Sequence, residues 1–499
     1  MHSVSHKFSQ RRTLINGLRL FWISLIFWYD YGIFRYRSGK CGWPLIDSDQ
    51  TPEHVLLVAD PQIIDHRSYP GRPALLTYIS QLIVDLNLRK NWRAALRSAP
   101  DVVFFLGDYM DSGRAVMSDS EYERYTQRFM NIFTMDSRIP RYFIPGNHDI
   151  GLGPSTLFSP HARTRYTSHF GPLNSQISIA NHTFVLIDAP GLVEEDYKRH
   201  GLGKSYDKWK ALAGGTIDFV KSFAAKDNTE PTILFSHIPL SRPEGSNCGP
   251  VRERGTIRRG VGLGYQNTLG KDSTKFLLEH LKPALIFSGD DHDYLTVKSL
   301  SMAMGVKKPG YQMLSIVPPG GLTSTISDAP CLMPDQLGIY LDVYIPLALA
   351  SLALILIACI VRGQHYRRCR WSFQFLSHTK QRSKDGTGSL QSKHVRRPTR
   401  SRIVIDEYGF TLDDNDMDQR LPPPASATVT AKKNALPTIL SQSRRLFCRL
   451  VSLQTLTKLV FASNRRGGFF REFLCDVRDV AIFPLGIIFL ISLWTFLDF

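Results

Sequence analysis

Five short apolar runs, each ending abruptly in polar residues, constrain the fold of this chain more than any other feature. One of them, YFIPGNHD at residues 142–149, stops at Gly146 before Asn147, His148 and Asp149. A run of β-branched and aromatic residues of this length predicts a buried strand, and a glycine directly after it allows a sharp turn. In a layered α/β fold, ligands and catalytic groups collect at such strand ends.

The other four runs end in the same way. They cover residues 54–60, 101–108, 232–237 and 284–292, and they lead respectively to Asp60 and Gln62, to Asp108, to His237, and to Asp290, Asp291 and His292. Each of these residues taken alone is most often a turn former or a helix cap. Five consecutive strand ends are poorly explained in that way. Asp, Asn and His without Cys are ligands of hard to borderline divalent cations, so we expect a metal site where these strands meet at one edge of a sheet.

The segments between the strands have helical spacing at residues 75–96, 121–133 and 272–281. Alternation of strands and helices predicts an α/β layered sandwich. The globular part extends over residues 52–330, which is long enough to bury a substantial core.

The motif order D-x-Q, G-D, G-N-H-D, H and G-D-D-H closely resembles that of the calcineurin-like metallophosphoesterases, over about residues 55–316. The wider strings VADPQII, FLGDYMDSGR, IPGNHDIG and SGDDHDYL are similar to the fungal branch of the membrane-bound enzymes that remodel glycosylphosphatidylinositol (GPI) anchors. The resemblance implies a four-layer α/β metallophosphoesterase sandwich with a dinuclear metal site. It also implies hydrolysis of ethanolamine phosphate from a GPI mannose in the endoplasmic reticulum or Golgi, which supports maturation and transport of GPI-anchored proteins.

The resemblance further implies two divalent metal ions and assigns their ligands. Asp108 would bridge both ions, and the remaining ligands would be Asp60, Gln62 and His292 for one ion and Asn147, His237 and Asp290 for the other. The usual family pattern has histidine at the positions of Gln62 and Asp290. This chain therefore exchanges two imidazoles for oxygen ligands, as the fungal branch does, and the harder site favours Mn²⁺ over Zn²⁺.

Two residues beside the ligands are candidates for catalysis. His148 follows Asn147, and its imidazole could protonate a leaving alkoxide. Asp149 could orient that imidazole or cap a helix. Asp111 is a candidate hydrogen-bond partner behind the metal ligands, and Arg72 and Arg114 are candidates for phosphate contacts.

Two segments are long and apolar enough to span a membrane. Residues 343–361 contain no charge in 19 positions and are followed at once by arginines, and residues 480–497 contain none in 18 positions. Residues 14–34, which follow a basic segment at 1–13, predict an amino-terminal signal-anchor helix. A cleaved signal peptide is the alternative interpretation of that segment.

The charge of the chain is concentrated between the last two spans. Residues 362–478 hold 23 Lys and Arg against 9 Asp and Glu, in a chain whose net charge is +17. The positive-inside rule then predicts that residues 1–13 and the loop 362–479 are cytosolic and that the catalytic domain is lumenal. The loop is rich in Ser, Pro and basic residues, so we expect it to be a largely disordered, solvated segment that sets the topology. Contact with anionic lipid headgroups is the alternative, and no nucleic acid is expected as partner.

The seven cysteines show no zinc-finger spacing. Cys41 and Cys331 flank the domain near its membrane tethers and are candidates for a disulfide. Similar fungal sequences carry cysteine where this chain has Leu295, which leaves the pairing of Cys248 open. Asn181 begins an N-x-[ST] sequon, which is consistent with N-glycosylation in a secretory lumen.

Two alternatives to the GPI phosphodiesterase hypothesis remain. One is a lumenal phosphodiesterase that acts on another glycan or lipid phosphate. The other is a non-catalytic cargo receptor for GPI-anchored proteins that keeps only the fold. Retention of cation ligands together with a proton donor favours an enzyme, because a receptor has no need of both.

Overall fold

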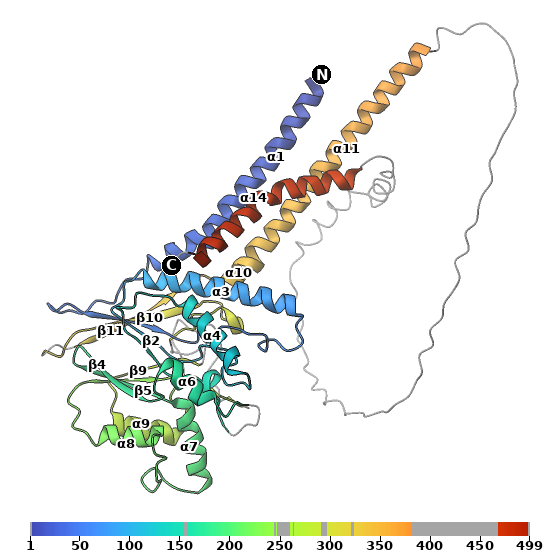
Figure 1. Ribbon diagram of the computed structural model, residues 1–499. Helices are drawn as coiled ribbons and strands as arrows, with labels where there is room; N and C mark the ends of the chain where they lie inside the picture. The colour runs from blue at the N-terminus through green and yellow to red at the C-terminus, as the bar shows by residue number, and fades with distance from the viewer. Residues whose placement is uncertain are drawn as a thin grey trace, which may run out of the picture. The chain divides into compact units, whose positions relative to one another are not determined.

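The computed structural model describes residues 2–153, 158–243, 246, 260–262, 264–290, 297–320, 324–381 and 468–497. His292, Cys248 and residues 382–467 of the basic loop lie outside the described residues. The chain divides into two units, Met1–Ala353 with Asp476–Phe499, and Leu354–Cys475. The first unit contains the layered domain (Figure 1).

The layered domain is built on two sheets of mixed direction. The first sheet has the order β11-β10-β1-β2-β3, with β1 (Glu53–Val58), β2 (Val102–Phe105), β3 (Arg141–Phe143), β10 (Gly310–Ile316) and β11 (Ile326–Leu332). The second has the order β4-β5-β6-β9, with β4 (Ser175–Ile179), β5 (His182–Ile187), β6 (Thr232–Ser236) and β9 (Leu285–Ser288). Strands β1, β2 and β3 are parallel to one another, as are β5, β6 and β9. A short hairpin of β7 (Val261–Gly262) and β8 (Tyr265–Gln266) stands apart from both sheets.

Alternating side chains of each central strand enter two different cores. In β1, Leu56 and Val58 join the cluster on the outer face of the first sheet, whereas Val55 and Leu57 join the cluster between the two sheets. Successive residues of a strand point to opposite faces, so a strand buried on both sides must be apolar throughout. This explains why the runs in the sequence are continuously apolar.

Helices cover the outer faces of both sheets. Residues of α3 (Ala74–Leu96), α4 (Asp119–Ile132) and α6 (Ala162–Phe170) pack into the outer core of the first sheet. Residues of α7 (Ala189–Gly201), α8 (Thr216–Ala224) and α9 (Lys271–Leu281) do the same for the second sheet. The result is a four-layer sandwich, and α3, α4 and α9 confirm the three helices expected from spacing.

One expectation about the strands was wrong. The five motif-bearing strands do not end at one edge of a single sheet, because β1, β2 and β3 belong to the first sheet and β6 and β9 to the second. A continuous apolar run indicates that both faces of a strand are buried, but it does not indicate which sheet the strand joins. The metal ligands therefore come from two sheets.

The remaining helices flank the domain in sequence. They are α1 (His2–Phe27), a π-helical turn (Trp28–Gly32), α2 (Ile33–Ser38), α10 (Gln336–Gly338), a second π-helical turn (Ile339–Tyr344), α11 (Ile345–Gln381) and α14 (Phe469–Leu497). Among the described residues, two helical segments are long and apolar enough to cross a membrane, Gln336–Gly363 and Phe469–Leu497. They contain the spans expected at 343–361 and 480–497. The helix expected at 14–34 covers the second half of α1, the π-helical turn that follows it and the start of α2, and it is outside this apolar pair.

A disulfide joins Cys41 to Cys331, with a Cα–Cα distance of 5.7 Å. It connects the segment after α2 to strand β11 at the edge of the first sheet. The candidate pairing of these two cysteines is therefore present in the structure.

Candidate metal centre

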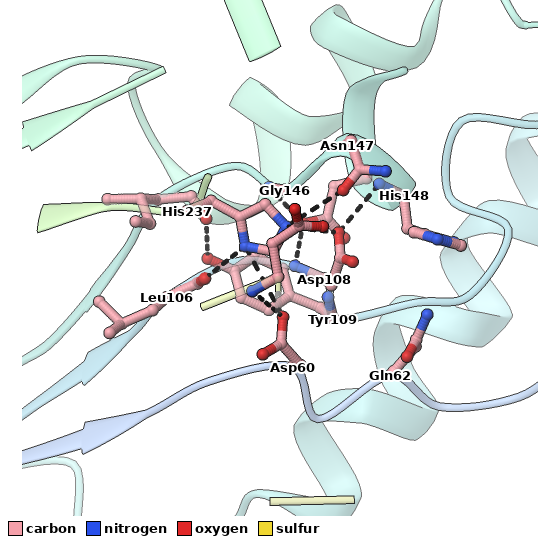
Figure 2. A network of polar contacts seen from close by, with 12 residues as sticks. Asp60, Gln62, Leu106, Asp108, Tyr109, Gly146, Asn147, His148 and His237 are labelled. Atoms are coloured by element: carbon pink, nitrogen blue, oxygen red, sulfur yellow. Dashed lines mark hydrogen bonds and ion pairs between the residues drawn. The ribbon is translucent and has the colours of Figure 1, made fainter. Parts of the chain in front are cut away.

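Asp60, Asp108 and His237 form a buried cluster of metal-binding side chains. Their ligand atoms all lie within 4.8 Å of one another. The Nε2 atom of His237 lies 3.3 Å from Asp108 Oδ1, and its Nδ1 lies 3.7 Å from Asp60 Oδ1. Figure 2 shows the three side chains converging from the ends of β1, β2 and β6. The cluster thus forms where the carboxyl ends of strands from both sheets meet.

Two further predicted ligands, Asp290 and Asn147, lie next to this cluster. Asp290 Oδ1 lies 3.7 Å from His237 Nε2, and the backbone N–H of Asp290 donates to Asp60 Oδ1 at 3.1 Å. Asn147 Oδ1 lies 3.1 Å from His237 Nε2, while its Nδ2 donates to the carbonyl of Gly264 at 2.9 Å. That hydrogen bond turns the amide oxygen of Asn147 toward the cluster.

The backbone at the ligands is held in an uncommon conformation. Asp60, Asp108 and Asp290 have φ values of 45°, 53° and 62°. Aspartate adopts this left-handed region more readily than most residues, but still at some cost in free energy. Such conformations concentrate at functional sites, where the surrounding structure enforces them. The sharp turns aim the carboxylates inward instead of along the strand direction.

Hydrogen bonding fixes the tautomer of His237 when the imidazole is neutral. Its Nδ1–H donates to the carbonyl of Leu106 at 2.7 Å, which leaves Nε2 with its lone pair toward Asp108 and Asn147. A metal-binding histidine commonly donates its second nitrogen to a backbone carbonyl in this manner. The contact therefore prepares Nε2 as a ligand atom.

The buried carboxylates of the cluster favour a positive charge among them. Burial opposes protonation of His237, yet the carboxylates of Asp108, Asp290 and Asp60 raise its pKa well above the ordinary value. Burial likewise acts to raise the pKa of Asp108, but His237 and His148 outweigh it and hold that pKa well below its usual range. Buried carboxylates are stable only when paired or when they coordinate metals. Oxygen and imidazole donors in this arrangement fit a divalent cation.

Gln62 does not join the cluster, contrary to the expectation that it would bind a metal. Its Nε2 donates to Asp111 Oδ1 at 3.2 Å, and the side chain lies apart from Asp60 (Figure 2). Its backbone N–H donates to the carbonyl of Asp108 at 2.8 Å. The φ of 39° at Gln62 directs its side chain differently from that of Asp60, which the D-x-Q spacing could not reveal.

His148 lies beside the cluster, and its imidazole points away from His237 (Figure 2). Its backbone N–H donates to Asp108 Oδ1 at 2.9 Å. Its Nδ1 lies 2.6 Å from the carbonyl oxygen of Asp111 and 3.4 Å from Asp111 Oδ1. With Nδ1–H donating to that carbonyl, Nε2 is left to exchange a proton. The side chain is 19% exposed, so a ligand can reach it.

Of the two roles left open for Asp149, the helix cap is the one present, and its carboxylate accepts backbone hydrogen bonds instead of orienting the imidazole of His148. Its Oδ2 accepts hydrogen bonds from the backbone N–H groups of Asp108 at 2.8 Å and Gly146 at 2.9 Å, and its Oδ1 accepts from Tyr109 at 2.9 Å. Burial and the charge of Asp108 raise the pKa of Asp149 to about 7, although the hydrogen bond from Gly146 acts to lower it. Asp149 therefore positions the loop that carries Asp108, and it also caps the short helix α5 (Asn147–Ile150).

The two candidate phosphate-binding arginines lie in different places. Arg114 Nη1 donates to the carbonyls of Asn147 at 3.1 Å and Gly264 at 2.7 Å, so its guanidinium is fixed next to a predicted ligand. Burial lowers its pKa from the ordinary value. Arg72 instead stacks on Tyr69, with its Cζ 3.8 Å from the ring centroid, and precedes helix α3.

Several groups that shape the site were missed in the sequence. The carbonyls of Leu106 and Gly264 accept hydrogen bonds from His237, Asn147 and Arg114. Backbone acceptors have no side-chain signature, so a motif search cannot find them. Asn181, the predicted glycosylation site, is exposed in the turn between β4 and β5.

The sequence of this chain matches known phosphoesterases. A sequence model described as "Calcineurin-like phosphoesterase" matches residues 54–294. The chain is also 33% identical over 351 residues to Cell division control protein 1 of Saccharomyces cerevisiae, spanning 63% of this chain and 68% of the relative. This chain belongs to the calcineurin-like phosphoesterase family.

Other similar proteins include Metallophosphoesterase 1 homolog of Drosophila melanogaster, 28% identical over 56% of this chain and 77% of the relative. A solved structure, a dimetal phosphatase from Danio rerio, matches with a TM-score of 0.33 and 14% identity over 57% of this chain and all of that one. Through this family membership, the chain has the metallophosphoesterase fold and is a metal-dependent phosphoester hydrolase.

Proposed function

We propose that this phosphoesterase is a membrane-bound, Mn²⁺-dependent phosphodiesterase that hydrolyses ethanolamine phosphate from a mannose of GPI anchors. GPI-anchored proteins or the GPI glycolipid would be its substrates. It would act in the endoplasmic reticulum or Golgi and support maturation and transport of GPI-anchored proteins. The observation that carries the proposal is a buried cluster of side chains suited to metal binding, in a domain that is followed in sequence by two apolar helices.

The membrane arrangement is part of the proposal. Residues 1–13 and 362–479 would be cytosolic, and 14–34, 343–361 and 480–497 would span the membrane. The domain at 52–330 would then face the lumen, where the GPI glycan lies. The excess of basic residues after the second span supports this orientation. Glycosylation at Asn181 would fit the same placement.

The side chains of the cluster have distinct tasks in this reaction. Asp60, Asp108, Asn147, His237 and Asp290 would hold divalent cations, with His292 as a proposed sixth ligand. Bound cations would neutralise the phosphodiester and acidify a water molecule that attacks phosphorus. His148 would donate a proton from Nε2 to the leaving mannose oxygen, because Nδ1 is engaged by Asp111. Arg114 holds the backbone of Asn147 and so keeps its amide oxygen in place.

The proposal is tested by mass spectrometry of GPI glycans released from cells that lack the protein. The cells are rescued with wild type, with Asp108→Asn, or with Asp207→Asn, which changes an exposed carboxylate away from the cluster. We expect an extra ethanolamine phosphate to persist with Asp108→Asn and to disappear with the other two. The fragment masses then identify the mannose.

Identical glycans in every strain would reject this substrate and direct the search to other lumenal phosphodiesters. A non-catalytic cargo receptor predicts a different result, since Asp108→Asn should then still restore transport of GPI-anchored proteins. Measuring glycans and transport in the same strains separates the two functions.

A further inference from the structure

The outward face of helix α3 changes character along its length. Its inward face packs into the core, for example through Leu88 and Trp92. At 3.6 residues per turn, the side opposite that core carries an apolar set in the amino-terminal half and a basic set in the carboxyl-terminal half. The apolar set is Leu75, Tyr78, Ile79 and Leu82, and the basic set is Arg89, Lys90 and Arg93 with Arg97, which caps the carboxyl-terminal end of the helix.

The basic half of this face contacts the helices that flank the domain. Lys90 Nζ lies 2.6 Å from Asp30 Oδ1, and Asp30 Oδ2 accepts a hydrogen bond from the hydroxyl of Tyr344 at 2.7 Å. Arg93 donates to the carbonyl of Thr495 at 2.8 Å. Tyr344 lies in the first third of one segment apolar enough to cross a membrane, Gln336–Gly363, and Thr495 lies near the carboxyl-terminal end of the other, Phe469–Leu497.

These contacts place the basic half of α3 at the level where those segments would leave the membrane. Trp494 lies beside the same contacts, in a pocket with Lys90, Arg93 and Arg97. Aromatic rings and long cationic side chains are enriched at the membrane–water interface, where the cations approach lipid phosphates.

The apolar half continues the same face but is left open. Leu75 is 69% exposed, Tyr78 64%, Ile79 40% and Leu82 36%, and Leu76 at its flank is 52% exposed. Single exposed apolar residues are ordinary, but a contiguous set on one helix face marks a binding surface. The basic half contacts the two segments apolar enough to cross a membrane, and the apolar half continues the same helix face away from those contacts.

We propose that the amino-terminal half of α3 lies in the plane of the membrane, with Leu75, Tyr78, Ile79 and Leu82 in the acyl boundary of the adjacent leaflet. An amphipathic helix in this position buries its apolar face while its cations contact headgroups. The occupant of the surface is therefore the lipid bilayer itself.

This contact deepens the proposed function, on which that part of the inference rests. Residues 61–73 alone connect the ligand Asp60 to the start of α3 at Ala74. Fixing the amino-terminal end of α3 to the bilayer thus holds the loop that leads to the metal centre close to the headgroups. The arrangement favours phosphate esters carried by membrane-anchored molecules over soluble ones.

The test uses the full-length protein in phospholipid nanodiscs. The photoreactive residue is introduced as Ile79→p-benzoylphenylalanine and, as a matched control, Leu278→p-benzoylphenylalanine on α9. The two positions have nearly equal exposure, 40% and 42%, but α9 covers the other sheet. After irradiation, mass spectrometry detects lipid adducts. We expect at least about tenfold more acyl-chain adduct at position 79, because only an interfacial helix reaches that depth.

Equal adduct levels at both positions, or cross-links from position 79 to protein, would overturn the proposed membrane contact. A second measurement compares Leu75→Asp/Ile79→Asp with Leu278→Asp on two phosphodiesters, one soluble and one presented in vesicles. We expect the double variant to keep activity on the soluble ester and to lose about tenfold on the vesicle ester as the membrane contact weakens. Equal activity of both variants on the vesicle ester would overturn the substrate preference. If the protein proves inactive on GPI glycans, the lipid adducts at position 79 should still form. The proposed substrate and the proposed membrane contact of α3 can therefore be refuted separately.

Discussion

Asp149→Asn separates a positioning role from a catalytic one. The side chain is only 1% exposed, and each carboxylate oxygen accepts backbone hydrogen bonds. Oδ2 takes those of Asp108 and Gly146, and Oδ1 takes that of Tyr109. An asparagine of the same shape has one oxygen and one NH₂ group. In either orientation, the NH₂ group faces at least one N–H donor that it cannot satisfy.

The loss of stability in Asp149→Asn follows from the number of backbone N–H donors that are left without an acceptor. Each buried N–H that loses its partner costs about 1–3 kcal/mol, so one or two of them cost about 1–6 kcal/mol. For a domain of this size, each kcal/mol lowers Tm by roughly 2–4 °C. We therefore expect Tm to fall by about 5 °C or more when the donors of Asp108 and Gly146 are the ones affected.

The assay is thermal unfolding of the detergent-solubilised full-length protein at pH 8, where Asp149 is charged, since its pKa is raised to about 7. Metal content and phosphodiesterase activity are measured on the same samples, and Asp207→Asn serves as the control. Stability and metal content should fall together with activity. If activity alone falls and both other quantities match wild type, Asp149 acts directly in the chemistry and the positioning role is refuted.

Three further predictions concern other parts of the molecule. Gly146→Ala should abolish activity, because the added Cβ would collide with the carboxylate and the backbone nitrogen of Asp108. Gly201→Ala should be neutral, because nothing lies within 4 Å of the Cβ added there, and activity assays check both variants. His148→Gln should lower kcat by about 10²- to 10⁴-fold while metal content, measured by plasma emission, stays unchanged. Cys331→Ser removes the bridge to Cys41, which spans 290 residues, and should destabilise the domain by about 2–5 kcal/mol, with a reducing agent lowering the Tm of wild type only.

Much of the fold and part of the site could be predicted from sequence, for identifiable physical reasons. Asp60, Asp108 and His237 each follow an apolar run, and the end of a buried strand determines where the next side chain lies. That rule holds for the first polar residue after the strand. Gln62 lies two residues beyond Asp60, where the backbone conformation decides the direction of the side chain, and the sequence does not reveal a φ of 39°.

The roles of Asp149 and Asp111 show a second limit. Adjacency in sequence left two roles open for Asp149, orienting the imidazole of His148 or capping the helix, because it does not show that neighbouring side chains at the start of a helix diverge. Asp149 turns to backbone N–H groups, and the carbonyl of Asp111 takes the contact with His148 instead. Contacts between loops of distant strands depend on the packing of the whole domain, which local patterns do not describe.

The two-sheet origin of the cluster makes metal binding depend on the core between the sheets. Phe104 in that core stacks on Phe184 with ring centroids 5.1 Å apart and meets Phe235 edge-on at 4.8 Å, so it joins the strand before Asp108 to the strand before His237. Phe104→Ala and Phe276→Ala, the latter on α9 in the outer core of the second sheet, should each cost about 3–5 kcal/mol of stability.

Only Phe104→Ala should also weaken metal binding, because its cavity lies between the strands that carry the two halves of the site. Metal titration of both variants at a temperature where each remains folded checks this difference. Equal metal affinities would show that the loops alone position the ligands and that the packing of the sheets against each other has no part in it.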